Sequence, residues 1–335
     1  MPDMDYAVLG NTGLKVSRLG FGSSGMGNIY TSVSQEEIDR TVAEAVEEAG
    51  INYFDVAPSY GPEGLAETRL GIALRGRRDK VIVATKAGRY DHGTDGYPDF
   101  EYTFEPQRTK LELENSLRRL QTDHVDLYQL HDITNSGNLD MLVEDTLPVL
   151  EKLREEGKLL KIGVTGAHLP SLEYVASRSP YVDCVLTFGR YNLMDTTLEE
   201  YAPKYRAIRG LGIVNSSLTF MGFLTQDHRE IRDLRRKRMV NALTEAIEKA
   251  KSVCEEYGTD LGSAAVQFGL CCEHCADSTL IAMARNVRLH QNLDLYRRRR
   301  EIDPELVRKL RGILNGLFPW TPKLPVTAGT RSAQK

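Results

Sequence analysis

Eight short apolar segments recur along the chain, and between them lie longer segments with helical periodicity. The apolar segments cover 18–22, 51–57, 80–87, 124–131, 159–165, 183–188, 212–217 and 278–283. Most are apolar at successive positions instead of alternate ones, which is typical of parallel strands covered by helices. The predicted helices cover 34–49, 65–74, 109–120, 139–153, 169–176, 198–208, 237–257 and 304–314, and the seventh could continue over 262–271.

This alternation predicts a closed (β/α)8 TIM barrel and leaves an open, doubly wound α/β sheet as the alternative. A short β-hairpin is expected ahead of the barrel over 6–17, where a polar turn with glycines separates two apolar runs. Ser34, with Glu37 three residues on, predicts the N-cap of the first helix. Because no linker or break in composition divides the chain, we expect one domain over 1–335, with long C-terminal rim loops and a loop or tail over 319–335.

The charge balance gives no sign of a nucleic-acid partner. The chain has 43 Lys and Arg against 47 Asp and Glu, which leaves a formal net charge of −4. A run of four arginines over 297–300 could bind a polyanion, but we expect it to form a solvated helix face.

The sequence also gives no sign of a membrane partner. Its first residues lack the basic and apolar regions of a secretory leader, and no apolar run approaches the roughly 18 residues of a membrane span. We therefore expect a cytoplasmic protein whose partner is a small molecule, and the oligomeric state stays open.

Three of the five cysteines fall in the segment 271–275 (CCEHC), which could suggest a metal site. No second Cys/His pair lies at a spacing typical of zinc ligands. We therefore expect no metal and predict buried free thiols on a helix, in a reducing compartment.

Four polar side chains lie at or just after the ends of three consecutive predicted strands. Asp55 ends the second strand, Tyr60 lies in the loop after it, Lys86 ends the third strand and His131 ends the fourth. Each alone has a structural explanation. Asp55 could cap a helix, and Tyr60 could be a surface aromatic residue. Lys86 could be a solvated amine, and His131 could be bonded to a backbone carbonyl. Together they indicate one site, because the active sites of α/β barrels lie at the carboxyl ends of the strands.

These four groups can move a proton. A tyrosine phenol has an ordinary pKa of about 10, too high for efficient proton transfer near neutral pH. A neighbouring ammonium group favours the phenolate and lowers that pKa, and a buried carboxylate can hold the ammonium in place. An imidazole can orient the reacting oxygen. The set fits reversible protonation of a carbonyl oxygen, coupled to hydride transfer from a bound nicotinamide.

The segments that carry these residues resemble the active-site motifs of the aldo-keto reductases. They are 52–61 (NYFDVAPSYG), 84–86 (ATK) and 130–131 (LH), and the segments 9–17 (LGNTGLKVS) and 19–22 (LGFG) resemble the hairpin and first strand of that family. The likeness extends over about residues 5–320.

The resemblance implies a role for each of the four residues. Tyr60 would be the general acid and base, and Lys86 would lower its pKa. Asp55 would anchor Lys86, and His131 would orient the substrate's carbonyl or hydroxyl group. The implied cofactor is NADP, with NAD as the alternative.

The resemblance also implies a set of cofactor-binding residues. They are Gly22, Ser23, Asp55, Thr165, Gly166, Ser216, Ser217, Leu218, Met283, Arg285, Arg288, Gln291 and Asn292. Arg285 and Arg288 could hold a 2′-phosphate through charge-assisted hydrogen bonds, whereas Ala282 stands where the family's motif has a lysine.

Three further positions depart from the common pattern of the family. Gly166 replaces an asparagine, Phe188 a glutamine, and Ser216 a tyrosine that often stacks on the nicotinamide. We therefore expect looser or different contacts to the nicotinamide ring.

Within the family the chain most resembles members of the L-galactose dehydrogenase and aldose 1-dehydrogenase type. The segments 85–90, 163–166 and 189–191, together with Asp195, carry this likeness. It implies hydride transfer between nicotinamide C4 and a sugar or sugar-derived carbonyl or alcohol. The candidate contacts to sugar hydroxyls are Tyr30, Arg89, Tyr90, Asp132, Arg190 and Trp320.

Two other functions stay open from the sequence. One is a broad NADPH-dependent aldehyde or ketone reductase. The other is a subunit that senses the nicotinamide redox state without turnover.

Overall fold

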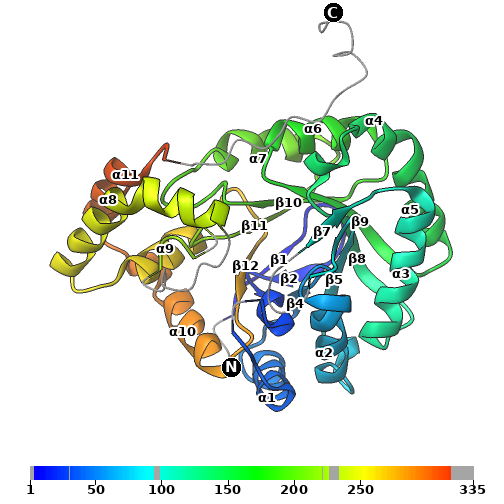
Figure 1. Cartoon of the computed structure of the whole chain (residues 1–335), viewed down its shortest axis with the longest axis horizontal. Helices are drawn as coiled ribbons and strands as arrows, with labels where there is room; N and C mark the ends of the chain where they lie inside the picture. The colour runs from blue at the N-terminus through cyan, green and yellow to red at the C-terminus, as the bar shows by residue number, and fades with distance from the viewer. Residues whose placement is uncertain (1–3, 30, 94–98, 221, 226–233, 318–335) are drawn as a thin grey trace, which may run out of the picture.

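The computed structural model describes residues 4–29, 31–93, 99–220, 222–225 and 234–317, and its centre is a closed barrel of parallel strands (Figure 1). In order around the barrel, the strands are β3 (Leu19–Gly22), β4 (Tyr53–Asp55), β5 (Ile82–Ala87), β8 (Val125–Leu130), β9 (Leu159–Gly166), β10 (Cys184–Phe188), β11 (Gly212–Ser216) and β12 (Ser278–Ala282). β12 pairs again with β3 and closes the ring. All eight predicted strands are confirmed, and the open sheet is excluded.

Helices surround the barrel and cover the outer side of its strands (Figure 1). They are α1 (Gln35–Glu47), α2 (Leu65–Ala73), α3 (Pro106–Leu120), α4 (Leu139–Met141), α5 (Leu147–Glu155), α6 (Leu169–Arg178), α7 (Leu198–Ala207), α8 (Leu234–Glu256), α9 (Leu261–Leu270), α10 (Asn286–Arg297) and α11 (Pro304–Leu314). Ser34 caps α1 as predicted, because its side chain accepts a hydrogen bond from the Glu37 backbone N–H.

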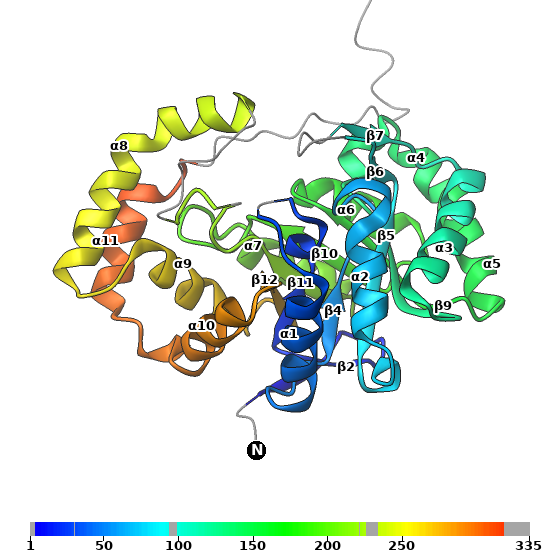
Figure 2. The same ribbon diagram turned by 60° about the horizontal axis from the view of Figure 1, so that its bottom comes forward.

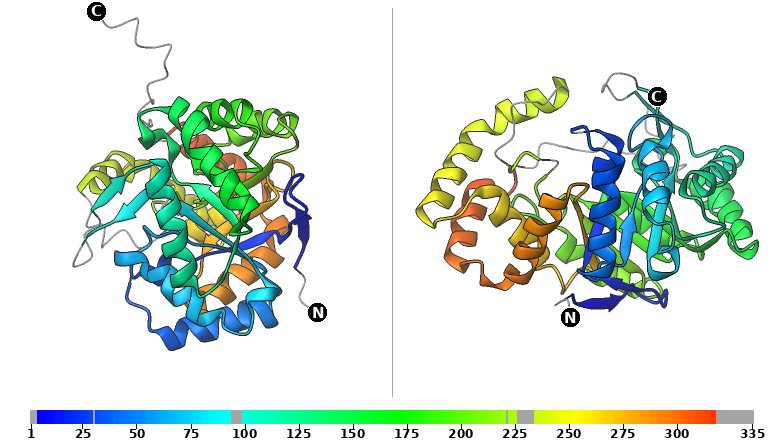
Figure 3. Two further views of the ribbon diagram at one scale, coloured as in Figure 1. Left: turned by 90° about the vertical axis from the view of Figure 1, so that its right-hand side faces the viewer. Right: turned by 90° about the horizontal axis from the view of Figure 1, so that it is seen from below.

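Two hairpins stand at opposite ends of the barrel (Figure 2). The predicted N-terminal hairpin consists of β1 (Tyr6–Val8) and β2 (Lys15–Ser17), and it lies across one end of the barrel (Figure 3). Leu9 and Val16 are buried among the apolar side chains that line the barrel interior, so this hairpin closes the amino end. The other hairpin was not predicted from the sequence and consists of β6 (Arg89–Asp91) and β7 (Phe100–Tyr102).

The predicted helix over 139–153 is not continuous. α4 passes into a wide π-helical turn over Leu142–Thr146 before α5 begins. Pro148 lies at the start of α5 and has no N–H to donate, and its ring would clash with the carbonyl group four residues earlier. A wide turn relieves that clash, which apolar periodicity alone does not reveal.

Two other helical predictions also change. The helix over 237–257 does not continue, because Gly258 adopts a φ of +68° and Asp260 caps a new helix, α9, by accepting from the Ser263 N–H at 2.9 Å. α10 was not predicted as a helix, because its segment stood out only for its resemblance to a cofactor motif. It buries the apolar side chains Leu289, Leu293 and Tyr296 along one face.

The cysteine segment 271–275 lies in the turn after α9 and not on a helix as predicted. Cys272 and Cys275 are buried free thiols, whereas Cys271 is half-buried. Among the described residues, no cluster of His, Cys, Asp and Glu side chains could hold a metal ion. Over the same described ranges, no helix has the length and apolar character needed to cross a membrane.

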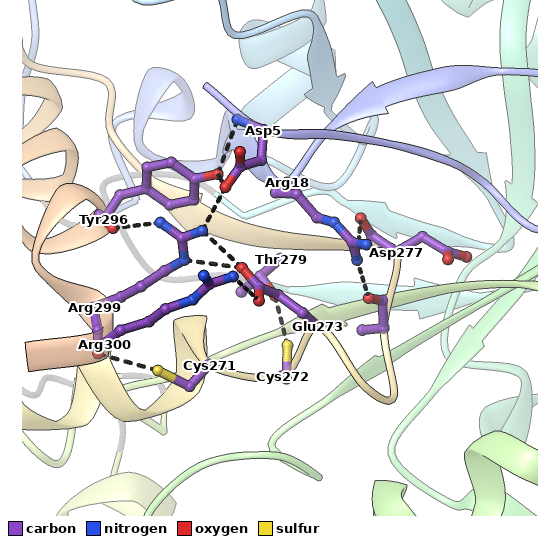
Figure 4. Close-up of polar contacts among 11 residues, drawn as sticks. Asp5, Arg18, Cys271, Cys272, Glu273, Asp277, Thr279, Tyr296, Arg299 and Arg300 are labelled. Carbon is purple, nitrogen blue, oxygen red and sulfur yellow. Dashed lines mark hydrogen bonds and ion pairs between the residues drawn. The ribbon is translucent and has the colours of Figure 1, made fainter. Parts of the chain in front are cut away.

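The prediction that the arginine run 297–300 forms a solvated helix face is wrong for Arg299. The side chain of Arg299 is only 8% exposed. Its guanidinium group contacts the carboxylates of Asp5 and Glu273 and donates to the Tyr296 carbonyl at 2.9 Å (Figure 4). These contacts join the N-terminal segment to the end of α10. The sequence did not reveal them because Asp5 lies almost 300 residues from Arg299.

This difference within the arginine run predicts unequal effects on stability. Arg299→Ala removes a largely buried guanidinium group and its hydrogen bonds to Asp5, Glu273 and the Tyr296 carbonyl, and should lower the free energy of unfolding by about 2 kcal/mol. Arg300 contacts the same Glu273 but is 72% exposed, so Arg300→Ala should cost less than about 1 kcal/mol. Urea unfolding of both variants, followed by circular dichroism, measures the difference. Equal losses would contradict a structural role specific to Arg299.

Candidate active site

The four residues predicted from the strand ends meet inside the carboxyl end of the barrel. The Nζ of Lys86, on β5, contacts Asp55 Oδ1 at the end of β4 and donates to the Val56 carbonyl at 2.9 Å. The same nitrogen lies 3.4 Å from the Tyr60 hydroxyl oxygen. His131 follows β8, and its ring stands edge-on to that of Tyr60 with 5.9 Å between the centroids.

The alternation of β5 turns Lys86 inward. Successive side chains of a strand point to opposite faces, so Lys86 enters the barrel while Thr85 points out toward the helices. There, Thr85 donates to the buried carboxylate of Glu67 on α2, and Arg119 on α3 donates to Glu67 at 2.6 Å. This outer network fixes β5 against two helices and thereby helps to hold Lys86.

Asp55 has a second partner that the sequence analysis missed. Gln129 on β8 donates from Nε2 to Asp55 Oδ2 at 3.0 Å, so both carboxylate oxygens are bonded. A glutamine inside an otherwise largely apolar buried strand was the available signal, because a buried amide needs a polar partner.

The loop that carries Tyr60 is packed tightly against the turn Ser24–Gly27. A Cβ added at Gly27 would lie 2.1 Å from the Tyr60 carbonyl oxygen. Gly61, the next residue of the loop, has a φ of +86° and approaches Gly27 equally closely. Only glycine allows this contact, so these two positions fix the backbone where Tyr60 joins Gly61.

The charges of the cluster set the protonation states of its members. Burial alone would lower the pKa of Lys86, but the charge of Asp55 raises it above its usual value, so Lys86 is an ammonium group. Burial raises the pKa of Tyr60, and the positive charges of Lys86 and Arg89 oppose this effect only in part. Tyr60 is therefore a neutral phenol at neutral pH.

His131 is also neutral. Burial, with the positive charges of Arg89 and Lys86, holds the pKa of the imidazole well below its usual value. Its Nδ1 lies 3.4 Å from the Ser59 hydroxyl oxygen, another contact that the sequence did not indicate.

Several residues of the predicted cofactor set lie at the ends of β3, β9 and β11. The Ser23 N–H donates to the Asp55 carbonyl at 2.9 Å, next to Gly22 at the end of β3. Thr165 accepts from the Asp132 N–H at 3.0 Å, and Gly166 ends β9 beside it. Ser216 ends β11 and donates to the Thr187 carbonyl at 3.3 Å.

Other residues of the predicted cofactor set lie after β11, after β12 and on α10. Ser217 has a φ of +65°, and Leu218 and Met283 are buried. Asn292 is buried on α10 with its amide directed to the Ala282 carbonyl, 3.5 Å away.

The two arginines of this set are exposed. Arg285 donates to the Ser32 carbonyl at 3.0 Å, and Arg288 donates to Gln291 Oε1 at 3.2 Å. In the part of the chain that the structure describes, neither guanidinium group forms an ion pair with a carboxylate.

Only part of the predicted substrate set lies with the cluster. Arg89 and Asp132 form an ion pair at 3.0 Å, and Arg89 influences the pKa of Tyr60 and His131. Tyr90 lies on the opposite face of β6 from Arg89, is buried, and accepts from the Gly88 N–H at 3.1 Å.

Of the three other predicted substrate residues, the structure describes only Arg190. Arg190 forms an ion pair with Asp195 at 2.9 Å and donates to the Ala167 carbonyl. Tyr30 and Trp320 lie outside the described residues.

Known proteins resemble the chain over nearly its whole length. The model of the Aldo/keto reductase family matches residues 18–315. The chain is 35% identical over 303 residues to an L-galactose dehydrogenase of Arabidopsis thaliana, and this match covers 88% of each protein. It is 32% identical to a D-threo-aldose 1-dehydrogenase of a Pseudomonas species, over 84% of this chain and 90% of that protein.

A solved structure supports the same relationship. An aldo-keto reductase from Bacillus halodurans, in its holo form, superimposes with a TM-score of 0.68 and 27% identity. The match covers 92% of this chain and 96% of the other. The resemblance inferred from the motifs, including the likeness to sugar dehydrogenases, is thus confirmed. A family model that spans the whole barrel, and dehydrogenase relatives matched over most of their length, show that the chain belongs to the aldo/keto reductase family and is an oxidoreductase acting on alcohol or carbonyl groups.

Proposed function

We propose that this protein is a nicotinamide-dependent sugar oxidoreductase in which Tyr60 gives a proton to, or takes it from, the reacting oxygen. The observation that carries this proposal is the contact of the Tyr60 hydroxyl with the buried ammonium group of Lys86. Lys86 is in turn held by Asp55. A phenol placed beside a fixed positive charge can lose and regain its proton reversibly.

The residues at the strand ends fit a nicotinamide nucleotide. The Ser23 hydroxyl oxygen is buried with no hydrogen-bond partner among the described residues, so a ligand group could satisfy it. Arg288 is exposed and could bind a phosphate. Once bound, the nucleotide would supply or accept a hydride at C4 of its nicotinamide.

The remaining steps belong to the side chains of the cluster. In reduction, the neutral His131 can donate a hydrogen bond to the carbonyl oxygen and orient it. Tyr60 then gives its proton to that oxygen, and Lys86 stabilises the resulting phenolate. In oxidation, Tyr60 takes the proton back. The neutral imidazole suits this role, because it offers a hydrogen bond without competing as a strong acid.

A sugar or sugar-derived substrate is supported by two observations. The relatives with 35% and 32% identity are named for the oxidation of L-galactose and D-threo-aldoses. Arg89 and Asp132 place charged hydrogen-bonding groups next to the cluster, which suits a polyol better than an apolar carbonyl compound.

The proposal is tested by turnover and by removal of the Tyr60 hydroxyl. Turnover of a panel of aldoses, keto-sugars and aryl aldehydes is measured with NADP and with NAD, in the directions of oxidation and reduction. The highest kcat/KM should belong to a sugar. Tyr60→Phe should lower kcat by about 10²–10⁴-fold while cofactor affinity, measured by fluorescence quenching, is retained. Tyr6→Phe, at the opposite end of the barrel and 39% exposed, is the matched control.

Three results of this experiment would contradict the proposal. Preference for aryl aldehydes would favour a broad aldehyde reductase. Tight cofactor binding without any turnover would favour a redox sensor. A Tyr60→Phe variant that kept a substantial rate would exclude Tyr60 as the proton donor.

The pKa of Tyr60 predicts different pH profiles for the reduction and the oxidation reaction. Since burial raises this pKa, the phenol stays protonated through neutral pH, and kcat/KM for reduction should be nearly constant from pH 6 to 9. Oxidation requires the minor phenolate form, so log kcat/KM should rise with a slope of about one per pH unit over the same range. Initial rates in overlapping buffers measure both profiles. A bell-shaped oxidation profile centred near pH 7 would contradict this assignment.

The choice between the two cofactors depends on Arg288. If its guanidinium group binds a 2′-phosphate, Arg288→Ala should raise the KM for NADP at least tenfold, since charge-assisted hydrogen bonds contribute about 1.5–3 kcal/mol. The KM for NAD should change little. Arg297→Ala, an exposed position at the far end of α10, is the control. Equal changes for both cofactors would exclude a 2′-phosphate role.

A further inference from the structure

The β6–β7 hairpin brings a charged side chain next to the proton-transfer cluster. β6 lies against the turn Pro62–Gly64, which follows Tyr60 in the chain. Arg89 is directly paired with Tyr102 across the hairpin, so the two side chains share one face. On that face, the guanidinium group of Arg89 stacks over the ring of Phe100 at 3.9 Å. The hairpin therefore holds Arg89 in one orientation.

The partner of Arg89 is held as firmly. Asp132 directly follows His131 and adopts a left-handed backbone conformation with a φ of +55°. Its N–H donates to Thr165 Oγ1 on β9 at 3.0 Å, and its Oδ2 accepts from Arg89 Nη1 at 3.0 Å. Thr165 therefore fixes the backbone of Asp132, and Arg89 fixes one oxygen of its carboxylate.

Two polar atoms of this pair lack a hydrogen-bond partner in the part of the chain that the structure describes. Asp132 Oδ1 and Arg89 Nε are both buried, and neither has a hydrogen-bond partner within the described residues. One is an acceptor and the other is a donor. Buried polar atoms are normally satisfied, so their lack of partners points to a ligand that supplies hydrogen bonds. The charge of Arg89 acts on Tyr60 and His131, so the pair lies near the proton-transfer cluster.

A hydroxyl group is the ligand that suits these two atoms. It can donate to a carboxylate oxygen and can also accept from a guanidinium N–H. A carboxylate ligand could not donate to Asp132, and an ammonium group could not accept from Arg89. In a sugar, the hydroxyl group on the carbon next to the reacting carbon stays close to the reacting oxygen.

We propose that Asp132, fixed by Arg89, selects substrates that carry a hydroxyl group on the carbon adjacent to the reacting carbon. This inference rests on the proposed function. It narrows the proposed substrate class to 2-hydroxy aldehydes, including sugars of that type. The alternative occupant of the two unpaired atoms is a buried water molecule, which would give no such selectivity.

Two small aldehydes isolate this hydroxyl group. Lactaldehyde and propanal differ only by a hydroxyl group on the carbon next to the aldehyde. The wild-type protein with NADPH should have a kcat/KM for lactaldehyde that is 10- to 100-fold higher than for propanal, because a site built for a hydroxyl group rejects the analogue that lacks it. In Asp132→Asn, the ratio of the two values should fall at least tenfold, because the amide loses the charge that strengthens the hydrogen bond.

A control on the same hairpin tests whether the effect is specific. Glu101 lies on β7 and forms an exposed ion pair with His92 at 2.7 Å, so Glu101→Gln should keep the wild-type ratio. The melting temperature and the NADPH affinity of both variants report whether the fold and the cofactor site are intact. Because the ratio compares two substrates of one variant, a general loss of rate does not affect it.

Two outcomes would overturn the inference. Equal kcat/KM values for lactaldehyde and propanal in the wild-type protein, or an unchanged ratio in Asp132→Asn, would mean that the pair holds a water molecule or acts only as support. Either result leaves the proposed function intact if sugars of the panel are turned over. If neither these aldehydes nor any sugar of the panel is turned over, the proposed function fails together with the inference.

Discussion

The buried ion pair of Lys86 and Asp55 is the contact on which the rest of the site depends. Removing two charges from water costs several kcal/mol for each ion, and their attraction alone does not reliably repay it. The barrel offsets the cost with further hydrogen bonds, from Lys86 to the Val56 carbonyl and from Gln129 to Asp55. Such a pair contributes little to stability compared with apolar residues of the same volume. Its presence in a barrel core is better explained by the chemistry it permits at Tyr60.

The same pair shows what a sequence can and cannot predict about a pKa. The resemblance implies that Lys86 lowers the pKa of Tyr60, and the charge of Lys86 does act in that direction. The net direction is nevertheless upward, since burial opposes the charge and has the larger effect. Burial depends on how segments that are distant in the sequence pack around the phenol, and no local pattern contains that information. The sign of each contribution could be predicted from the sequence, but their balance required the structure.

The predictions from the sequence succeeded where the physical cause is local. Strand and helix periodicity located all the strands of the barrel, and strand ends located the four residues of the cluster. Predictions failed where a feature depends on residues that are far apart in the sequence. The burial of Arg299 depends on Asp5 at the other end of the chain, and the β6–β7 hairpin pairs two three-residue strands that residues 92–99 separate in the sequence. Gln129 was overlooked because its partner, Asp55, lies 74 residues away.

The structure also links substrate selection to catalysis through the covalent chain. Arg89 lies three residues after Lys86, and Asp132 directly follows His131, so each proposed selecting group is attached to a proposed catalytic group. The Asp132 N–H is bonded to Thr165, which lies one residue before the end of β9 and belongs to the predicted cofactor set. A movement of Asp132 would therefore be transmitted to His131 and to Thr165. Because Asp accepts a positive φ more readily than most residues, few substitutions at this position could change the selected substrate and still preserve the backbone that places His131.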